Sequence, residues 1–412
     1  MNNPIEVWNL PNGIRVISQQ IKNSLIVQTG IVANVGTRDE ELNQNGIAHL
    51  FEHMAFKGTN KRKSWHILNS IDSVGGEINA FTTREKTSFH TTTTKQHLNR
   101  ALDLLTDIVF YSNFPEKELE KEKLVIYDEM DMYADNPEES IFDQFENLMF
   151  PNQTLGLPIL GNRETLSTIT VSDLKNFRDS LYTNPNVVIS IVGNFKRNLL
   201  ENYCKNYIEP ISMPDYKRPK RKAYKGDHFE INVLKTINQG HLIMGGTACN
   251  YFSEDFYAFS LLIHYLGGET MNNLLNLNIR EKYGICYHIN SFYVPYEDTG
   301  IWGIYAGFDF NNLKKLEKLI FKELNQLIEN SVSPSKLQRI KKQFIGHLIL
   351  SNESRFNRMQ SQAKNLLDYG RILPLEEIIA SIEQITIHQF HEVAKKYCNP
   401  YQLNKLIYQP QK

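Results

Sequence analysis

Residues 46–58 read Gly-Ile-Ala-His-Leu-Phe-Glu-His-Met-Ala-Phe-Lys-Gly, and no other stretch says more about this chain. Its apolar residues recur at the spacing of one helix face and Gly58 is a stop signal, so the stretch predicts a short buried helix. His49 and His53 are four residues apart and share one face of that helix. Glu52 directly precedes His53. Two imidazoles and a carboxylate on a buried helix need a partner, because such groups are costly to bury alone.

A divalent metal would supply that partner. Neutral imidazole is a common zinc ligand, and a catalytic zinc keeps one position open for water. A carboxylate beside that water can take its proton while the water attacks a carbonyl carbon. We therefore interpret His49 and His53 as metal ligands and Glu52 as a catalytic general base. The order of the residues reverses the commoner His-Glu-x-x-His pattern.

A third protein ligand is expected from the charge-rich stretch 116–131, which has a helical pattern. Glu118, Glu120, Glu122 and Glu129 all lie there, and most are expected on a solvated face. Glu122 and Glu129 differ by seven residues, so they fall two turns apart on one side of a helix. Spacing alone does not choose between these two glutamates.

The whole pattern resembles one peptidase family. Glu129 lies 76 residues after His53, and Glu122 precedes it by seven. In this the chain resembles the M16 family of inverted-motif zinc peptidases, in the branch of bacterial processing-type peptidases and the catalytic subunit of mitochondrial processing peptidase. The resemblance implies one bound Zn²⁺, with Glu129 as the third ligand and Glu122 as a carboxylate that orients a ligand. It also implies a zinc-dependent endopeptidase that hydrolyses peptide bonds in unfolded peptides or leader segments.

A second block concerns the substrate. Gly75-Gly76 is a turn signal, and the run from 78 to 89 is β-prone. The block resembles a glycine-led strand of the family, which implies that Asn79, Ala80 and Phe81 bind the peptide substrate as an added β-strand. An exposed edge strand can bind a peptide in this way. From the residues alone, an ordinary hairpin remains the alternative.

A third block, residues 278–287, resembles the Arg-x6-Tyr pattern of the family. The resemblance implies catalytic roles for Arg280 and Tyr287. A guanidinium can hold peptide carbonyls, and a phenol can donate to a developing oxyanion. A surface arginine and a strand tyrosine are the alternative. Residues 271–273 read Met-Asn-Asn where the family has Ser-Ser-Arg, so the lining of the cleft is in doubt.

Two acidic residues follow Glu129. Glu139 and Asp143 are four residues apart and share a helix face. The resemblance implies that they form an anionic pocket for a basic substrate residue on the N-terminal side of the scissile bond, since carboxylates bind a guanidinium in a bidentate fork. The alternative is an acidic helix start that the helix dipole favours.

The length of 412 residues predicts two domains, and an internal repeat supports this prediction. Ile169-Thr170 and Asn184-Pro185, separated by a helical segment, recur 215 residues later as Ile385-Thr386 and Asn399-Pro400, with Thr170 and Thr386 themselves 216 apart. The chain therefore has two copies of one α+β design.

The second copy lacks the metal motif. Residues 336–341 align with 118–123, and this alignment places Ile340 and His347 where Glu122 and Glu129 stand. We predict two homologous sheet-plus-helices domains that form a clamp around a peptide cleft. The expected parts are a catalytic zinc-binding domain at 1–212, a linker at 213–227, and at 228–412 a non-metal domain that contributes substrate-binding residues.

Composition argues against several other functions. The formal net charge is −1, so the basic run at 217–225 indicates a solvated linker and no nucleic-acid partner. No N-terminal secretory pattern is visible, and no apolar run approaches the ~20 residues that span a bilayer, so no membrane insertion is expected. The four cysteines have no paired spacing, which predicts reduced thiols and a cytoplasmic location.

Two other functions are considered. The chain could be a non-catalytic scaffold or core subunit of the same family, or the active half of a heterodimeric peptidase. An active enzyme is favoured because the metal and base positions are all filled and Arg280 and Tyr287 are both present. By analogy with relatives of this length, the resemblance implies a homodimer.

Overall fold

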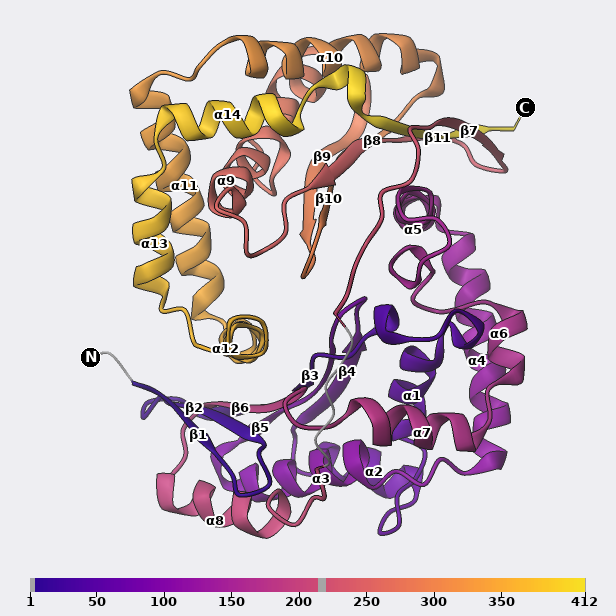
Figure 1. The fold of residues 1–412 in the computed structure, drawn as a ribbon, viewed down its shortest axis with the longest axis vertical. Helices are drawn as coiled ribbons and strands as arrows, with labels where there is room; N and C mark the ends of the chain where they lie inside the picture. Colours follow the sequence, from indigo (N-terminus) through magenta and orange to yellow (C-terminus); the bar gives the residue numbers. More distant parts are fainter. Residues whose placement is uncertain (1–3, 214–219, 412) are drawn as a thin grey trace. The chain divides into compact units, whose positions relative to one another are not determined.

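The computed structural model describes residues 4–213 and 220–411 of the chain. It is α+β, with two mixed sheets and their helices arranged as two compact units (Figure 1). The predicted fold class of two sheet-plus-helices parts is therefore confirmed. Residues 214–219, which belong to the expected linker, lie outside the described residues.

The first unit is built on a sheet with the strand order β1-β2-β6-β3-β5-β4. Strands β2 and β6 run parallel, and the other neighbours run antiparallel. Strand β6 is apolar and buried along its whole length, because helices cover both faces of the sheet. The strands are β1 (Ile5–Asn9), β2 (Arg15–Gln20), β3 (Ile26–Ala33), β4 (Glu77–Thr82), β5 (Thr87–Thr94) and β6 (Val187–Gly193).

Helix α1 carries the His-Leu-Phe-Glu-His motif and packs against β4 and α7 in this unit. On the sheet, α3 covers β3 and β5, while α12 covers β6 and β3. The helices are α1 (Ile47–Ala55), α2 (Ser64–Asp72), α3 (Leu98–Phe110), α4 (Glu116–Ala134), α6 (Arg163–Thr168), α7 (Val171–Leu181), α8 (Arg197–Tyr207) and α12 (Arg355–Tyr369).

The second unit repeats this design. Its strand order, β7-β11-β8-β10-β9, matches β2-β6-β3-β5-β4, and β7 and β11 again run parallel. The strands are β7 (Glu230–Lys235), β8 (Gly240–Ala248), β9 (Cys286–Pro295), β10 (Gly300–Phe308) and β11 (Asn404–Pro410). The helices are α5 (Pro137–Met149), α9 (Phe256–Gly267), α10 (Leu313–Glu329), α11 (Pro334–Glu353), α13 (Leu375–Gln384), α14 (Ile387–Tyr397) and one π-helix (Asn276–Glu281).

The compact units are not the contiguous parts 1–212 and 228–412 that the repeat predicts. Residues 131–156 belong to the second unit and residues 350–373 to the first. Figure 1 shows α5 beside the second sheet and α12 beside the first. The physical reason is burial: Met359 and Ala363 of α12 pack on apolar residues of the first sheet. Each sheet thus gains the cover of its outer face from a distant part of the chain.

Among the residues described, no helix combines the length and apolar character required to cross a membrane. The four cysteines, at positions 204, 249, 286 and 398, are buried and free.

Candidate metal centre

The imidazoles of His49 and His53 project from the same side of α1. Helix α1 is amphipathic, and its apolar residues enter the main core of the first unit. His49 is 8% exposed, and the ring centroids of His49 and His53 lie 4.6 Å apart. The four-residue spacing therefore brings both rings to one place, as helical periodicity requires.

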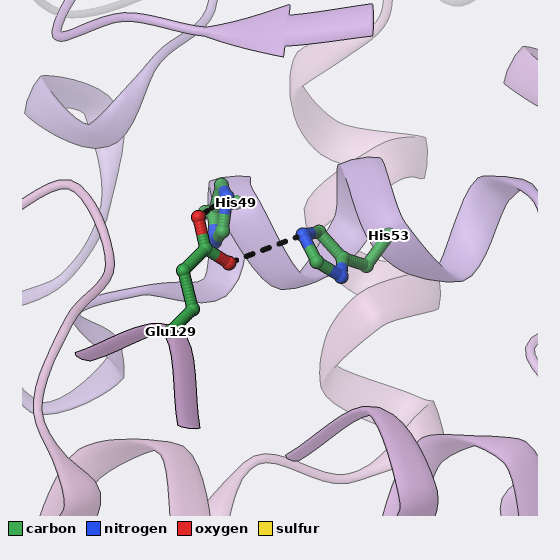
Figure 2. A group of neighbouring side chains, drawn as sticks. All are labelled: His49, His53 and Glu129. Carbon is green, nitrogen blue, oxygen red and sulfur yellow. Dashed lines mark ion pairs between the residues drawn. The ribbon is translucent and has the colours of Figure 1, made fainter. Parts of the chain in front are cut away.

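Helix α4 brings Glu129 to the same place. One carboxylate oxygen, Oε1, lies 3.9 Å from Nε2 of His49, and the other, Oε2, lies 3.7 Å from Nε2 of His53. Figure 2 shows the carboxylate of Glu129 directed at both rings. The Glu129 side chain is 43% exposed, so the three groups meet at the edge of the core and not within it. Such an edge leaves access for a substrate.

These three side chains fit a zinc ion. Their ligand atoms all lie within 4.8 Å of one another, and no other such group of three is found in the described part of the chain. A tetrahedral zinc site with bonds of about 2.1 Å places its ligand atoms about 3.4 Å apart. The His–Glu129 separations exceed that value by only about 0.5 Å or less. Two imidazoles, one carboxylate and an open fourth side match the donor set of catalytic zinc.

Glu122 lies next to the group and holds His53. Its Oε2 is 3.2 Å from Nδ1 of His53, and its Oε1 is 2.7 Å from Nζ of Lys57. A carboxylate only accepts hydrogen bonds, so Nδ1 of His53 donates and Nε2 keeps its lone pair toward Glu129. Burial acts to raise the pKa of Glu122, but the hydrogen bonds from His53 and Lys57 hold it below its usual value. Glu122 is therefore an ionised acceptor.

His49 is neutral in this environment. Burial, and secondly the charge of His53, lower the pKa of His49 to about 3. A neutral imidazole has a lone pair that is free to bind a metal. Its Nδ1 atom is buried and has no hydrogen-bond partner among the described residues. In this respect His49 differs from His53, whose Nδ1 is held by Glu122.

Glu52 is on the same helix and is tied to strand β4. The hydroxyl of Thr82 donates a hydrogen bond to Oε2 of Glu52. Burial raises the pKa of Glu52, which the hydrogen bond from Thr82 and the charge of His53 oppose. A carboxylate with a raised pKa is suited to proton transfer near neutral pH. Thr82 and Lys57 were not identified from the sequence. The only signals were that Thr82 ends the predicted strand and that Lys57 follows His53 by four residues.

Comparisons with known proteins agree with this geometry. Residues 15–163 match the model of the family described as "Insulinase (Peptidase family M16)", and residues 168–344 match "Peptidase M16 inactive domain". A Bacillus subtilis protein, "Uncharacterized zinc protease YmxG", is 32% identical over 395 residues, which cover 95% of each chain. The chain belongs to peptidase family M16. An "Uncharacterized zinc protease" of Rickettsia bellii is 31% identical over 96% of this M16 chain and 95% of its own length.

Solved structures show the same fold. A protease from Helicobacter pylori superposes with a TM-score of 0.90 at 21% identity, over 99% of this M16 chain and 100% of its own. A structure titled as a peptidase M16 inactive domain, from Pseudomonas fluorescens, gives 0.91 at 17% identity, over 99% and 98% of the two chains. The arrangement of both sheets is therefore one that M16 chains share.

Strand β4, the predicted substrate strand, is the last strand of its sheet and pairs with β5 alone among the described residues. Its side chains alternate between the two faces. Ala80 packs against the core on the side of α1, whereas Asn79 and Phe81 are exposed on the opposite face. The edge of β4 therefore has the form that can add a peptide strand.

Arg280 and Tyr287 belong to the second unit. Arg280 lies in the π-helix and donates to Oδ1 of Asn276 and Oε1 of Glu281. Tyr287 is 61% exposed on β9, at a β-bulge: Cys286 pairs with Phe308 and His288 with Gly307, which leaves Tyr287 as the extra residue. Single π turns and bulges often re-aim side chains at functional sites. Their part in the reaction remains a prediction.

Glu139 and Asp143 lie on α5, which packs on β8 and β11 of the second unit. They are four residues apart on this helix, as predicted. Glu139 is exposed and Asp143 is half-buried. The negative charges stand in the N-terminal half of α5, where the helix dipole favours them whether or not they bind a substrate. Their role in specificity remains a prediction.

Proposed function

We propose that this chain is a zinc-dependent endopeptidase. The observation that carries the proposal is the convergence of His49, His53 and Glu129, with the carboxylate of Glu52 on the same helix. The relatives that share 31–32% identity with the chain are named zinc proteases, which supports the same conclusion. His49, His53 and Glu129 would hold the metal, and Glu122 would orient His53.

The chemistry is hydrolysis of a peptide bond. When bound, zinc would supply a Lewis acid and lower the pKa of a water molecule. Glu52 takes a proton from the attacking water as the water oxygen forms a bond to the carbonyl carbon. Glu52 then delivers this proton to the amine nitrogen as the carbon–nitrogen bond breaks. Thr82, which donates to Oε2 of Glu52, holds the carboxylate in place.

The substrate would be an extended peptide. The free edge of β4 offers backbone donors and acceptors to a strand, with Asn79, Ala80 and Phe81 along its length. Main-chain pairing requires an unfolded segment, so flexible peptides and leader segments are the substrate class that this edge supports. We also propose that Arg280 and Tyr287 bind the substrate, and that Glu139 and Asp143 prefer a basic side chain. A homodimer and a cytoplasmic location likewise remain predictions.

Replacement of the base tests the proposal. Glu52→Gln removes the proton acceptor while it keeps the shape of the side chain and all three metal ligands. We expect kcat on an unstructured peptide to fall about 10²–10⁴-fold, because general bases contribute that much. Zinc content, measured by mass spectrometry, should stay at one per chain. Glu120→Gln is the matched control, since Glu120 lies on α4 with a side chain that is 64% exposed. Wild-type activity in Glu52→Gln would reject the proposed mechanism.

A further inference from the structure

The helix that carries the metal motif begins without a local cap. Gly46 is the N-cap residue of α1 and has a φ of +98°, which favours glycine. A Cβ atom on Gly46 would lie 3.0 Å from Cα of Gly161 and 3.0 Å from the carbonyl oxygen of Leu160. The close packing and the positive φ therefore exclude the serine, threonine, aspartate or asparagine that usually caps a helix.

A remote carboxylate takes the place of the cap. Oε2 of Glu40 accepts hydrogen bonds from the backbone N–H of Gly46, at 3.0 Å, and from Nδ2 of Asn45, at 2.9 Å. Oε1 of Glu40 accepts from the backbone N–H of Ala48, at 2.9 Å. Two backbone donors that the first turn of a helix leaves unpaired are thus satisfied by one side chain. A carboxylate is also the group that the helix dipole favours at this end.

The cost of this arrangement shows that it is specific. Glu40 is 7% exposed, and such carboxylates are rarely buried without a reason. Burial raises the pKa of Glu40 to about 8, and the hydrogen bonds from Ala48, Asn45 and Gly46 oppose that rise. All three printed contacts of the carboxylate are N–H donors, and two of them come from the backbone at the start of α1. Glu40 is therefore directed at this helix end.

His49 is the residue that depends on this end. It directly follows Ala48, whose N–H donates to Glu40. Metal-bound histidines almost always donate their second ring nitrogen to a fixed acceptor. His53 has such an acceptor in Glu122, but Nδ1 of His49 has none among the described residues. The direction of the His49 ring is thus set by the backbone of the first turn and by packing.

We propose that Glu40 is a positioning residue of the metal centre. Its carboxylate fixes the first turn of α1, and the first turn fixes the direction of the His49 imidazole. Glu122 positions His53 through a side-chain contact, whereas Glu40 positions His49 through the backbone. The predicted effect on the rate rests on the proposed function, but the predicted effect on metal binding does not.

Glu40→Gln tests this inference in the full-length protein. The amide keeps the size of the side chain but replaces one acceptor oxygen with an NH₂ group that faces N–H donors. We expect zinc affinity, measured by competition with a chelator, to fall about 10–100-fold, as for other groups that orient metal ligands. The visible spectrum of the Co²⁺-substituted protein should change, because the His49 ligand shifts. On a peptide substrate, kcat should fall while KM stays the same.

Glu323→Gln is the matched control. Glu323 is 5% exposed, accepts from Nδ2 of Asn278, and belongs to the second unit. This variant should lose thermal stability as Glu40→Gln does, and it should keep the zinc affinity and the Co²⁺ spectrum of the wild type. If Glu40→Gln does not fold, the same measurements on Glu40→Asp decide, with a smaller loss of affinity expected.

Wild-type zinc affinity and an unchanged Co²⁺ spectrum in the folded Glu40 variant would overturn the inference, even with a lower Tm. Equal spectral changes in Glu323→Gln would overturn it as well. If the wild-type protein binds zinc and hydrolyses no peptide, the proposed function fails, and the affinity and spectrum of the Glu40 variant still decide the role of Glu40.

Discussion

The two units of this chain solve the same packing problem and differ in their chemistry. Both place an equivalent buried lysine over the end of a short helix: Nζ of Lys123 donates to the carbonyl oxygen of Ser167, and Nζ of Lys341 to that of Glu383. Both start the next helix with a capping box, from Thr170 in one unit and Thr386 in the other. The two copies thus keep the groups that close helix ends and tie helices together.

The metal helix shows the opposite behaviour. A shift of 215 residues places Gly267-Gly268 at Glu52-His53 and His264 at His49. The second unit has therefore lost the base and one ligand. It keeps a pair of imidazoles, since the rings of His264 and His347 have centroids 5.2 Å apart. The comparison teaches that packing determines what both copies retain, whereas the metal centre is an addition that one copy can lack.

The sharpest test of this difference uses one histidine from each copy. His53→Ala removes a ligand, so we expect loss of zinc and a fall in peptidase activity of at least about 10³-fold, beyond the effect of losing a general base alone. His264→Ala removes the counterpart of His49 and should keep one zinc per chain and the wild-type rate. Metal content and kcat are measured on both variants. Equal losses in the two would contradict the proposed difference between the copies.

The next test asks whether the second unit takes part in the chemistry. Tyr287 is exposed at a β-bulge, as a side chain that serves function would be. If its phenol donates to the oxyanion, Tyr287→Phe should lower kcat about 10²-fold. Tyr283→Phe is a suitable control, because Tyr283 is exposed in the same segment. An unchanged kcat in Tyr287→Phe would place this tyrosine outside the reaction.

A smaller effect is expected for substrate choice. Glu139 and Asp143 lie on α5, and the proposed pocket would prefer arginine two residues before the cut. Matched peptides with arginine or alanine at that position should differ about 10-fold in kcat/KM, the value of one hydrogen bond to a charged group. Glu139→Ala/Asp143→Ala should remove the difference. A wild type without this preference, or a double variant that retains it, would show that the pocket is absent.

The smallest effect concerns the remaining imidazole pair. Burial, and secondly the charge of His347, lower the pKa of His264 to about 4 from its usual 6.5. The unfolded chain therefore binds a proton near pH 6.5 that the folded chain refuses until about pH 4, so stability is lost as pH falls through this window. Between pH 7 and 5 the wild type should lose about 1 kcal/mol more than His264→Gln, a value reduced for partial exposure. Denaturant unfolding at both pH values measures this difference, and equal losses would contradict it.

Much of the fold follows from local patterns. The helical spacing around His49 and Glu52 predicted α1, the run at 187–193 predicted β6, and the repeat predicted two similar sheets. The exchange of α5 and α12 could not be predicted in this way. Both helices are amphipathic, and an apolar face such as that of Met359 does not indicate which sheet will cover it.

The site was predictable to the extent that the family pattern and helical periodicity reach. Spacing left Glu122 and Glu129 equivalent, because the choice depends on how α4 crosses α1. The structure separates them: Glu129 faces both Nε2 atoms, and Glu122 pairs with Nδ1 of His53. Glu40 and Thr82 had no signal, because each acts on α1 through a tertiary contact that no local spacing encodes.

The central claim is that the first unit alone holds the catalytic metal. Anomalous diffraction at the zinc absorption edge tests it most directly, on crystals of the protein purified without added metal. We expect one strong peak about 2.1 Å from Nε2 of His49, Nε2 of His53 and a carboxylate oxygen of Glu129, and no peak beside His264. A zinc peak at His264 and His347, or an empty site at His49, would contradict the account.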